Sequence, residues 1–476
     1  MKIIKYILLL ISVLLISCGS EKEKVIPQEI NRAVDLDSIK ARGKLVAITG
    51  YNAYSYFIYR GLPMGFEYDL VKRLADHLEV DLEIVVEKNI NEMFRMLNNN
   101  EGDIIAFNLT VTAERKEKVE FTRHHHTTKQ VLVQRRPDNW RRMMRHQIER
   151  KLIRSPFDLD GKTITVRNGS AYVRRLQNLI DETGININIV EGAPDLSTED
   201  LIEMVANKEI DYTVSDDNIA MLNQAYYSNI DIGTDISLPQ KIAWALRKDA
   251  DSLLTEINTW LDDLHRDPDY YTIYKKYYQN RHAFKDRLIS EFFSPRTGKI
   301  SEYDELLKEY SKYLDWDWRI LASLIYQESR FDHTAKSWAG AVGLMQIMPA
   351  TAEQLGVEDL TDPFENIEAG IRYLVWLDNY WKKEIEDKDE RIKFVLASYN
   401  IGLGHIMDAR ALAEKYGENN SVWFDNVELF LLKKSKEKYF NDEVVKYGYA
   451  KGVETIAYVE DILERFDHYK QFVAAI

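Results

Sequence analysis

Hydrophobic and polar positions follow two different patterns along this chain, and the change comes near residue 300. Before that point, short apolar runs at 44–49, 82–86 and 102–107 predict buried strands, and 66–78 reads as an amphipathic helix. Alternating strands and helices predict a parallel α/β sheet. After that point, nearly every apolar position repeats at helical spacing, which predicts helices at 302–314, 318–329, 349–355, 367–381, 391–399, 406–416, 423–431 and 453–469.

Length and turn signals divide the chain into two folded units. The 476 residues suffice for two or three domains, and a hydrophobic fraction of 45% supports sizeable cores. The clearest turn cluster is the SPRTG sequence at 294–298. We therefore expect a first unit at 35–282 with its second lobe at about 137–238, a linker at 283–298, and a mainly helical unit at 299–476.

The N-terminus reads as an export signal. Two lysines precede an apolar run at 6–16, which is too short to span a bilayer. The run ends in LISC, which resembles a bacterial lipobox, and Cys18 is the only cysteine of the chain. We expect residues 1–18 to be a lipoprotein signal, Cys18 to carry lipid, and 19–34 to be a flexible tether. The alternative is an ordinary signal peptide with an incidental cysteine; in either case no intramolecular disulfide can form.

Charge and composition exclude some partners. Lys+Arg is 63 and Asp+Glu is 77, and the resulting net charge of −14 argues against a nucleic-acid partner. We find no metal or cofactor motif. Segment 135–154 is rich in arginine and predicts a solvated helix at the junction of the lobes, with contact to anionic lipid or wall polymer as the alternative. The adjacent His124, His125 and His126 point to alternating faces of a strand, which favours a structural role.

The candidate catalytic group is the carboxyl of Glu328. It lies four residues after Leu324 and three after Ile325, so it shares the inward face of the predicted helix at 318–329. A carboxyl group placed there is desolvated, which raises its pKa and lets it hold a proton near neutral pH. The alternative is a surface glutamate at a helix end.

Four motifs in the last third of the chain carry a resemblance. They are Glu328 with its following serine, the GLMQ turn at 343–346, ASYN at 397–400 with Gly402 and Gly404, and ET at 454–455 followed by YV at 458–459. In this order they resemble the goose-type lysozyme and lytic transglycosylase family. The resemblance implies a mainly α, lysozyme-like fold that binds peptidoglycan glycan strands and cleaves the β-1,4 bond between N-acetylmuramic acid and N-acetylglucosamine.

The resemblance also implies residue roles. Glu328 would protonate the leaving oxygen and then accept a proton from the 6-hydroxyl of the sugar, which closes a 1,6-anhydro ring without water. Ser337 would orient the N-acetyl group, although a loop-capping serine is the alternative. The remaining expected substrate contacts are Met345, packed against the sugar, Gln346, Tyr399 near the carboxyl group, Asn400, Glu454 and Tyr458.

The first unit resembles the periplasmic solute-binding proteins of the polar amino acid type. The resemblance rests on GFEYDL at 65–70, TVTAER at 110–115, the strand at 160–166 and the strand ending at Asp216. It implies an α/β fold of two lobes in which Arg115 clamps an α-carboxylate, Asp216 takes the amino group, and Thr110 and Ser170 add donors. An amino acid or muropeptide ligand is implied; the alternative is a structural ion pair at Arg115.

The order of the two units resembles the membrane-bound lytic murein transglycosylase F group. We therefore expect a lipid-anchored enzyme of a Gram-negative cell envelope, at the outer membrane and facing the periplasm, with regulation by the ligand of the first unit. Two alternatives stay open. One is a non-catalytic sensor that only grips the wall, and the other is a lysozyme that uses water.

Overall fold

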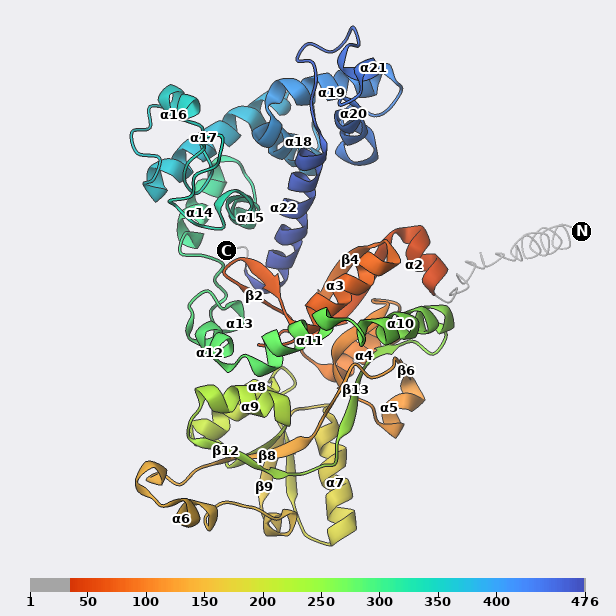
Figure 1. The fold of residues 1–476 in the computed structure, drawn as a ribbon, viewed down its shortest axis with the longest axis vertical. Helices are drawn as coiled ribbons and strands as arrows, with labels where there is room; N and C mark the ends of the chain where they lie inside the picture. The colour runs from red at the N-terminus through yellow and green to blue at the C-terminus, as the bar shows by residue number, and fades with distance from the viewer. Residues whose placement is uncertain (1–34, 475–476) are drawn as a thin grey trace, which may run out of the picture.

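The computed structural model describes residues 35–474 and consists of an α/β part and a helical part (Figure 1). The expected signal peptide, the tether and the lipidated Cys18 lie outside the described residues. Within residues 35–474, none of the helices combines the length and the apolar character needed to cross a membrane. The N-terminal half forms the two-lobed part, and the C-terminal third forms the helical part at the top of Figure 1.

Lobe one is built on a mixed sheet of strand order β4-β1-β5-β13-β6, with β7 paired to β13. β1 pairs in parallel with β4 and β5, and β13 closes the sheet antiparallel to β5. The strands are β1 (Lys44–Thr49), β4 (Asp81–Val86), β5 (Ile104–Thr110), β6 (Glu120–Phe121), β7 (His126–Thr128) and β13 (Gln240–Leu246). The parallel core strands lie where apolar runs predicted them. A short hairpin of β2 (Phe57–Tyr59) and β3 (Leu62–Met64) projects from this lobe.

The longer helices that cover this sheet each have one apolar stripe. α3 buries Phe66, Leu70, Leu74 and Leu78 at helical spacing, and its chain direction reverses at Glu79 in the left-handed conformation. The helices of this lobe are α2 (Leu36–Arg42), α3 (Phe66–Leu78), α4 (Ile90–Asn98), α5 (Ala113–Lys118), α10 (Asp251–Leu264) and α11 (Pro268–Tyr274), and a π-helical turn follows at Lys275–Gln279.

Lobe two begins earlier than expected. Its central strand β8 (Gln130–Arg135) pairs antiparallel with both β11 (Tyr212–Asp216) and β12 (Ile230–Asp235), so the lobe starts ahead of residue 137. β7 and β8 are almost continuous, and hydrophobic pattern alone does not show that the chain changes sheets between them. The lobe is completed by β9 (Thr163–Val166), β10 (Asn188–Glu191), α7 (Ala171–Thr183), α8 (Thr198–Ala206) and α9 (Asp217–Tyr226).

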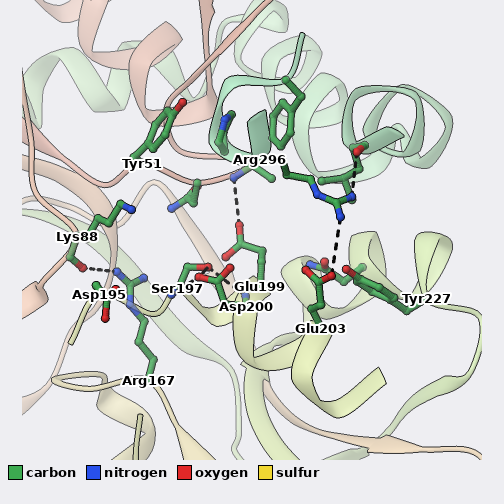
Figure 2. A pocket seen from close by; sticks show the side chains of 16 residues that line it. Tyr51, Lys88, Arg167, Asp195, Ser197, Glu199, Asp200, Glu203, Tyr227 and Arg296 are labelled. Atoms are coloured by element: carbon green, nitrogen blue, oxygen red, sulfur yellow. Dashed lines mark hydrogen bonds and ion pairs between the residues drawn. The ribbon is translucent and has the colours of Figure 1, made fainter. Parts of the chain in front are cut away.

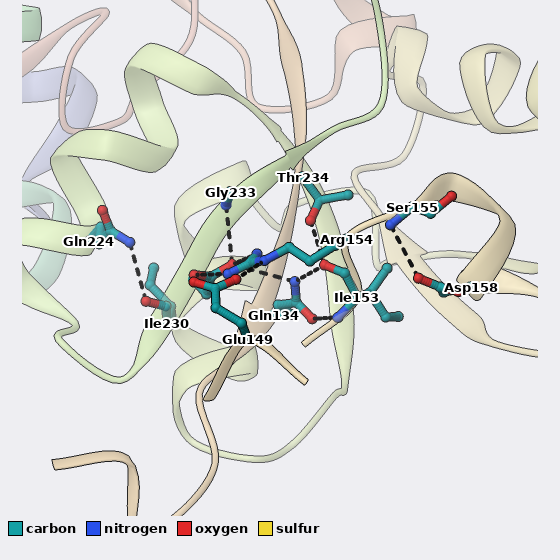
Figure 3. A network of polar contacts seen from close by, with 11 residues as sticks. Gln134, Glu149, Ile153, Arg154, Ser155, Asp158, Gln224, Ile230, Gly233 and Thr234 are labelled. Atoms are coloured by element: carbon teal, nitrogen blue, oxygen red, sulfur yellow. Dashed lines mark hydrogen bonds and ion pairs between the residues drawn. The ribbon is translucent and has the colours of Figure 1, made fainter. Parts of the chain in front are cut away.

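The arginine-rich segment does not form the single helix expected. It contains a 3₁₀ turn at Trp140–Arg142 and the short helix α6 (Arg145–Glu149), and a second 3₁₀ turn follows at Pro156–Leu159. The segment projects from lobe two far from lobe one (Figure 1). The C-terminal end of the segment is attached to lobe two by polar contacts (Figure 3). Arg154 holds Asp231 through contacts of 2.5 and 3.1 Å, and the Gln134 side chain bonds both the N–H and the C=O of Ile153.

The expected linker is folded onto the α/β part. It forms α12 (Arg281–Ile289) and α13 (Ser294–Thr297), and α12 packs on α9 of lobe two. The Ser294 hydroxyl accepts from the Ile58 N–H at 3.0 Å and donates to the Ile58 C=O at 2.8 Å. The segment expected to be a linker is therefore a folded part of the α/β unit, attached to lobe two through α12 and to lobe one through Ser294.

The helical part follows the predicted pattern closely. α15 and α16 begin and end at the residues expected. Asp317 caps the start of the first through the Arg319 N–H and Pro349 opens the second, and the two helices end at the C-caps Arg330 and Gly356, which are both in the left-handed conformation. Its helices are α14 (Asp304–Tyr310), α15 (Trp318–Ser329), α16 (Pro349–Leu355), α17 (Pro363–Trp381), α18 (Lys388–Ile401), α19 (Leu403–Lys415), α20 (Glu428–Lys433), α21 (Glu437–Phe440) and α22 (Val453–Phe472), with a 3₁₀ turn at Ser311–Tyr313 and a π-helical turn at Trp423–Val427.

Helix α22 joins the two parts. Its N-terminal half packs on α15 and α18, and its last turns reach the hairpin and α3 of lobe one (Figure 1). There the Tyr56 hydroxyl contacts His468 Nδ1 at 2.5 Å, the Tyr469 hydroxyl donates to the Gly61 C=O at 2.6 Å, and Phe472 stacks on Tyr51 at 4.0 Å between centroids. These side chains are mostly buried, so the contact is part of the protein core.

Candidate functional site

The Glu328 carboxyl lies on the last turn of α15, beside helix α22. The Tyr458 hydroxyl donates a hydrogen bond of 2.5 Å to Glu328 Oε1. Burial raises the pKa of Glu328 from 4.5 to about 7, although the bond from Tyr458 opposes the rise. A carboxyl group with this pKa is protonated in a large fraction of molecules at neutral pH, as a general acid must be.

The chain turns sharply just after this group. Arg330 and Phe331 both have positive φ, at 53° and 64°, so two consecutive residues adopt the left-handed conformation. The following loop is held by Asn366 of α17, which is fully buried. Its amide donates to the C=O groups of Val342 and Leu360, both at 2.9 Å, and its oxygen accepts from the Met345 N–H at 2.8 Å. Asn366 was not identified from the sequence, because no local pattern marks an asparagine that binds a loop 21 residues away.

Ser337 and Gln346 both stabilise this loop. The Ser337 hydroxyl accepts from the Ala341 N–H at 3.0 Å, which is the loop-capping arrangement considered as the alternative. The Gln346 amide donates to the C=O groups of Ala335 and Gly343, at 3.1 and 2.8 Å. Each side chain keeps unused hydrogen-bonding capacity, because the Ser337 hydroxyl can still donate its proton and the Gln346 side-chain oxygen can still accept a hydrogen bond.

Met345 differs from the expectation that it packs against a sugar. Its side chain is fully buried and lies against Gly370 of α17, where an added Cβ would come within 2.2 Å of the Met345 sulfur. Its backbone is what takes part in the site: the Tyr399 hydroxyl donates to the Met345 C=O at 2.7 Å. Tyr399 therefore supports the loop, and Tyr458 is the tyrosine that binds the carboxyl group.

The remaining motif residues separate into two kinds. Asn400 accepts a hydrogen bond of 2.7 Å from the Thr455 hydroxyl, so the motifs at 397–400 and 454–455 meet. Glu454 faces solvent, with 78% of its side chain exposed, and pairs with Lys451 at 3.0 Å. The residue that links this end of α22 to α18 is thus Thr455, while its neighbour Glu454 points away.

A second site lies between the lobes of the α/β part. Thr110, Arg115, Ser170 and Asp216 line one cavity of about 20 Å³, together with side chains that were not identified from the sequence: Tyr54, Phe107, Asn108, Arg167, Tyr172 and Thr198. The missed residues carry polar or aromatic groups but come from separate strands and helices. Only the closed fold brings them together.

The lobes touch directly at this cavity. Arg115 donates to the Thr110 C=O at 2.9 Å and across the lobes to the Gly169 C=O at 3.0 Å. Asn108 donates to Asp216 at 2.8 Å. Burial raises the pKa of Asp216 to about 7 and lowers the pKa of Arg115 to about 10. A cavity of this volume holds about one water molecule, so an amino acid enters only if the lobes open.

A larger chamber of about 130 Å³ adjoins this cavity and shares Arg167 with it. Figure 2 shows its walls: Tyr51 and Lys88 from lobe one, Glu199 and Glu203 from lobe two, and Arg296 from the segment after α12. The Ala53 N–H donates to Glu199 Oε1 at 3.2 Å, and Arg296 lies 3.8 Å from Glu203. Three parts of the chain thus meet around one space.

The histidine run is buried in lobe one. His125 and His126 touch through their Nδ1 atoms at 2.8 Å, and burial lowers the pKa of both, to about 3 for His126. They pack against Phe66 and are neutral. Among residues 35–474, no group of three or more His, Cys, Asp or Glu side chains is arranged to hold a metal ion.

Two family models match this chain. Residues 45–280 match the bacterial extracellular solute-binding proteins, family 3, and residues 305–422 match the transglycosylase SLT domain. The two-lobed α/β architecture and the helical architecture described above agree with these matches.

Curated relatives carry both regions in one chain. The chain is 38% identical over 435 residues to membrane-bound lytic murein transglycosylase F of Desulfosudis oleivorans, covering 91% of each chain. It is 32% identical to the protein of the same name from Pseudomonas fluorescens strain Pf0-1, covering 92% of this chain and 87% of that one. Among solved structures, it is 26% identical to holo ArgBP from T. maritima, with a TM-score of 0.41, covering 50% of this chain and 98% of that one.

Proposed function

We propose a function on the premise that this chain belongs to the membrane-bound lytic murein transglycosylase F family, as 38% identity over 91% of its length shows. The protein is a lytic transglycosylase that cleaves the β-1,4 bond between N-acetylmuramic acid and N-acetylglucosamine in peptidoglycan. The observation that carries the proposal is the partly buried carboxyl group of Glu328, which is held by Tyr458 and has its pKa raised to about 7.

The reaction needs one group that acts first as acid and then as base. Protonated Glu328 gives its proton to the glycosidic oxygen as the bond from that oxygen to the anomeric carbon breaks. The resulting carboxylate takes the proton of the muramic 6-hydroxyl while that oxygen bonds to the anomeric carbon. The product is a 1,6-anhydro ring, no water is consumed, and Glu328 regains its proton. An attacking group within the substrate has a large effective concentration, so a second protein carboxylate is unnecessary.

The roles of the surrounding residues follow from their contacts. Tyr458 orients the carboxyl group, and the Thr455–Asn400 bond fixes α22 against α18 behind it. Ser337 and Gln346 hold the loop and offer their remaining hydrogen-bonding capacity to the N-acetyl group. Met345 takes part through its backbone C=O, which accepts the bond from Tyr399, and Glu454 places a negative charge on the solvent-exposed surface.

The test is substitution of Glu328 by glutamine in the full chain. The amide keeps the shape and can still accept from Tyr458, but it has no acidic proton to donate. We expect cleavage of purified sacculi to fall by at least a factor of about 10²–10⁴, the usual contribution of acid–base catalysis. Mass spectrometry of the wild-type products should find anhydromuropeptides; reducing ends would instead identify a lysozyme, and cleavage by folded Glu328→Gln would reject the assignment.

We propose in addition that a ligand between the lobes regulates cleavage. Tyr51 lines the 130 Å³ chamber and also stacks on Phe472 of α22, the helix that carries Tyr458. Lobe movement that displaces Tyr51 therefore acts on the catalytic helix, with coupling of about 1–3 kcal/mol if it is of the usual size. A zwitterionic amino acid or wall-derived peptide suits Arg115 and Asp216. Titration of such ligands should change the rate for wild type and not for Arg115→Ala; binding without a rate change would refute it.

We propose finally that the mature protein is anchored in the cell envelope through lipid on Cys18, at the outer membrane and facing the periplasm. The support is the LISC sequence and the names of the relatives, which are called membrane-bound. Labelling with a fatty-acid analogue should mark wild type and not Cys18→Ser. Equal labelling of the two would refute lipidation at this residue.

A further inference from the structure

Helix α17 carries an aromatic stripe at the edge of its core-facing side, where Tyr373 and Tyr380 are partly buried against the core and Trp376 is exposed. Tyr373, Trp376 and Tyr380 follow one another at spacings of three and four, so they share one face of the helix. The adjoining face is buried through Leu374, Leu377 and Trp381. Trp376 is 53% exposed although it is among the largest apolar side chains, and the hydrophobic effect does not favour that position in water. Exposure of one large side chain is common, but Trp376 is exposed as part of a stacked pair with Tyr373, and a contiguous aromatic patch of this kind is a candidate binding surface.

The stripe is continuous with the catalytic centre. The Tyr373 ring contacts the Tyr399 ring at 5.5 Å between centroids, and on its other side it stacks on Trp376 at 5.8 Å with planes 11° apart. The Tyr399 hydroxyl supports the Met345 C=O in the loop that follows Glu328. The rings therefore form a connected series from the loop beside the carboxyl group to the exposed Trp376.

We propose that Tyr373, Trp376 and Tyr380 form an extended binding subsite for the glycan strand, beyond the sugars at Glu328. This rests on the proposed function. The flat C–H faces of pyranose rings pack on aromatic rings, and a β-1,4-linked amino sugar strand presents such faces in series. Seven residues of helix span about 10 Å, a length on the scale of a disaccharide. The strand is uncharged along its backbone, which matches a stripe that has aromatic rings and no charged group at its three positions.

The subsite acts on binding and leaves the proton transfers alone. None of the three side chains hydrogen-bonds Glu328, whose partner is Tyr458. Loss of Trp376 should therefore raise KM for long strands while kcat and the pH profile stay as in wild type. Trp376→Phe keeps an aromatic face and should restore most of the affinity.

The experiment measures binding separately from cleavage. In the full chain with Glu328→Gln, adding Trp376→Ala should weaken the retention of the protein on purified sacculi about tenfold, equivalent to about 1.4 kcal/mol. The matched control is Phe364→Ala, since Phe364 is 63% exposed on the first turn of the same helix but lies nine residues from Tyr373 and so on the opposite face. The control should bind like the parent.

Three outcomes would overturn the proposal. They are unchanged binding by Trp376→Ala, an equal loss in Trp376→Ala and Phe364→Ala, or a change of oligomeric state in sedimentation with no change in glycan binding, which would make the stripe a protein contact. The proposed catalytic function is judged independently, by the chain ends of the wild-type products and by whether Glu328→Gln still cleaves. Trp376→Phe guards against misfolding of the alanine variant.

Discussion

Replacing Tyr458 with phenylalanine removes the hydroxyl that donates to Glu328 Oε1 at 2.5 Å and leaves the ring in place. That hydrogen bond stabilises the charged carboxylate, so it lowers the pKa of Glu328, whereas burial, the larger effect, raises it to about 7. Without the bond only the effect of burial remains. The pKa of Glu328 should therefore rise further.

The size of the shift follows from the strength of the bond. A hydrogen bond to a charged group contributes about 1.5–3 kcal/mol, and one pKa unit corresponds to about 1.36 kcal/mol. The expected rise is about 1–2 units. Because the general acid must be protonated, the alkaline limb of kcat/KM should move from near pH 7 toward higher pH by that amount.

The assay is the initial rate of muropeptide release from sacculi at low substrate, measured across the pH range. Tyr399→Phe is the matched control, since the Tyr399 hydroxyl donates to a backbone carbonyl and not to the carboxyl group. Its limb should stay near that of wild type, although its rate falls because the loop loses support. An unmoved limb in Tyr458→Phe, or one displaced to lower pH, would refute the reasoning.

Two further predictions concern stability. The pKa of Glu328 in the folded protein, about 7, exceeds the ordinary value of 4.5, so between these pH values the folded state binds more protons than the unfolded state. Wild type therefore loses stability as the pH rises through this window, and the free energy of unfolding of Glu328→Gln should exceed that of wild type by up to about 3 kcal/mol above pH 7 and by almost nothing near pH 4. Thermal unfolding at several pH values would check this. Gly343 has φ of 82°, and an added Cβ would come within 2.2 Å of the Asn366 amide and 2.4 Å of the Leu360 oxygen, so Gly343→Ala should cost about 2–4 kcal/mol. Gly340→Ala, with nothing within 4 Å of its Cβ, should cost distinctly less in the same denaturation measurement, and similar losses for the two would contradict the steric argument.

Local signals were sufficient to predict much of the fold. The starts of α15 and α16 follow from Asp317 and Pro349, which act within one helical turn of themselves. The parallel strands of lobe one follow from apolar runs. The start of lobe two was placed too late, because β8 belongs to a sheet that forms only when β11 and β12 arrive about 80 to 100 residues later. Sheet membership is a long-range property that a hydrophobic run does not encode.

The candidate site was predicted less completely than the fold. The catalytic role of Glu328 could be inferred, because the helical spacing of apolar residues predicts that its side chain faces inward, where burial raises its pKa. The hydrogen-bond partner of its carboxyl group could not be inferred, because Tyr458 lies 130 residues away along the chain and the sequence alone does not distinguish it from Tyr399. The same holds for Asn366, whose three bonds are made to a loop, and for Met345, whose side chain is inward because Gly370 leaves it room.

The contact between Tyr51 and Phe472 has a consequence for how the protein is made. A chain synthesised from its N-terminus can cover Tyr51 with Phe472 only after more than 400 further residues have been added, because the last helical turn supplies Phe472 and Tyr469 to the surface of lobe one. Until then, Tyr51 and Tyr56 lack the partners that cover them. The two parts of this protein therefore cannot mature one after the other, and truncation within α22 should harm the first-made domain as well as the last.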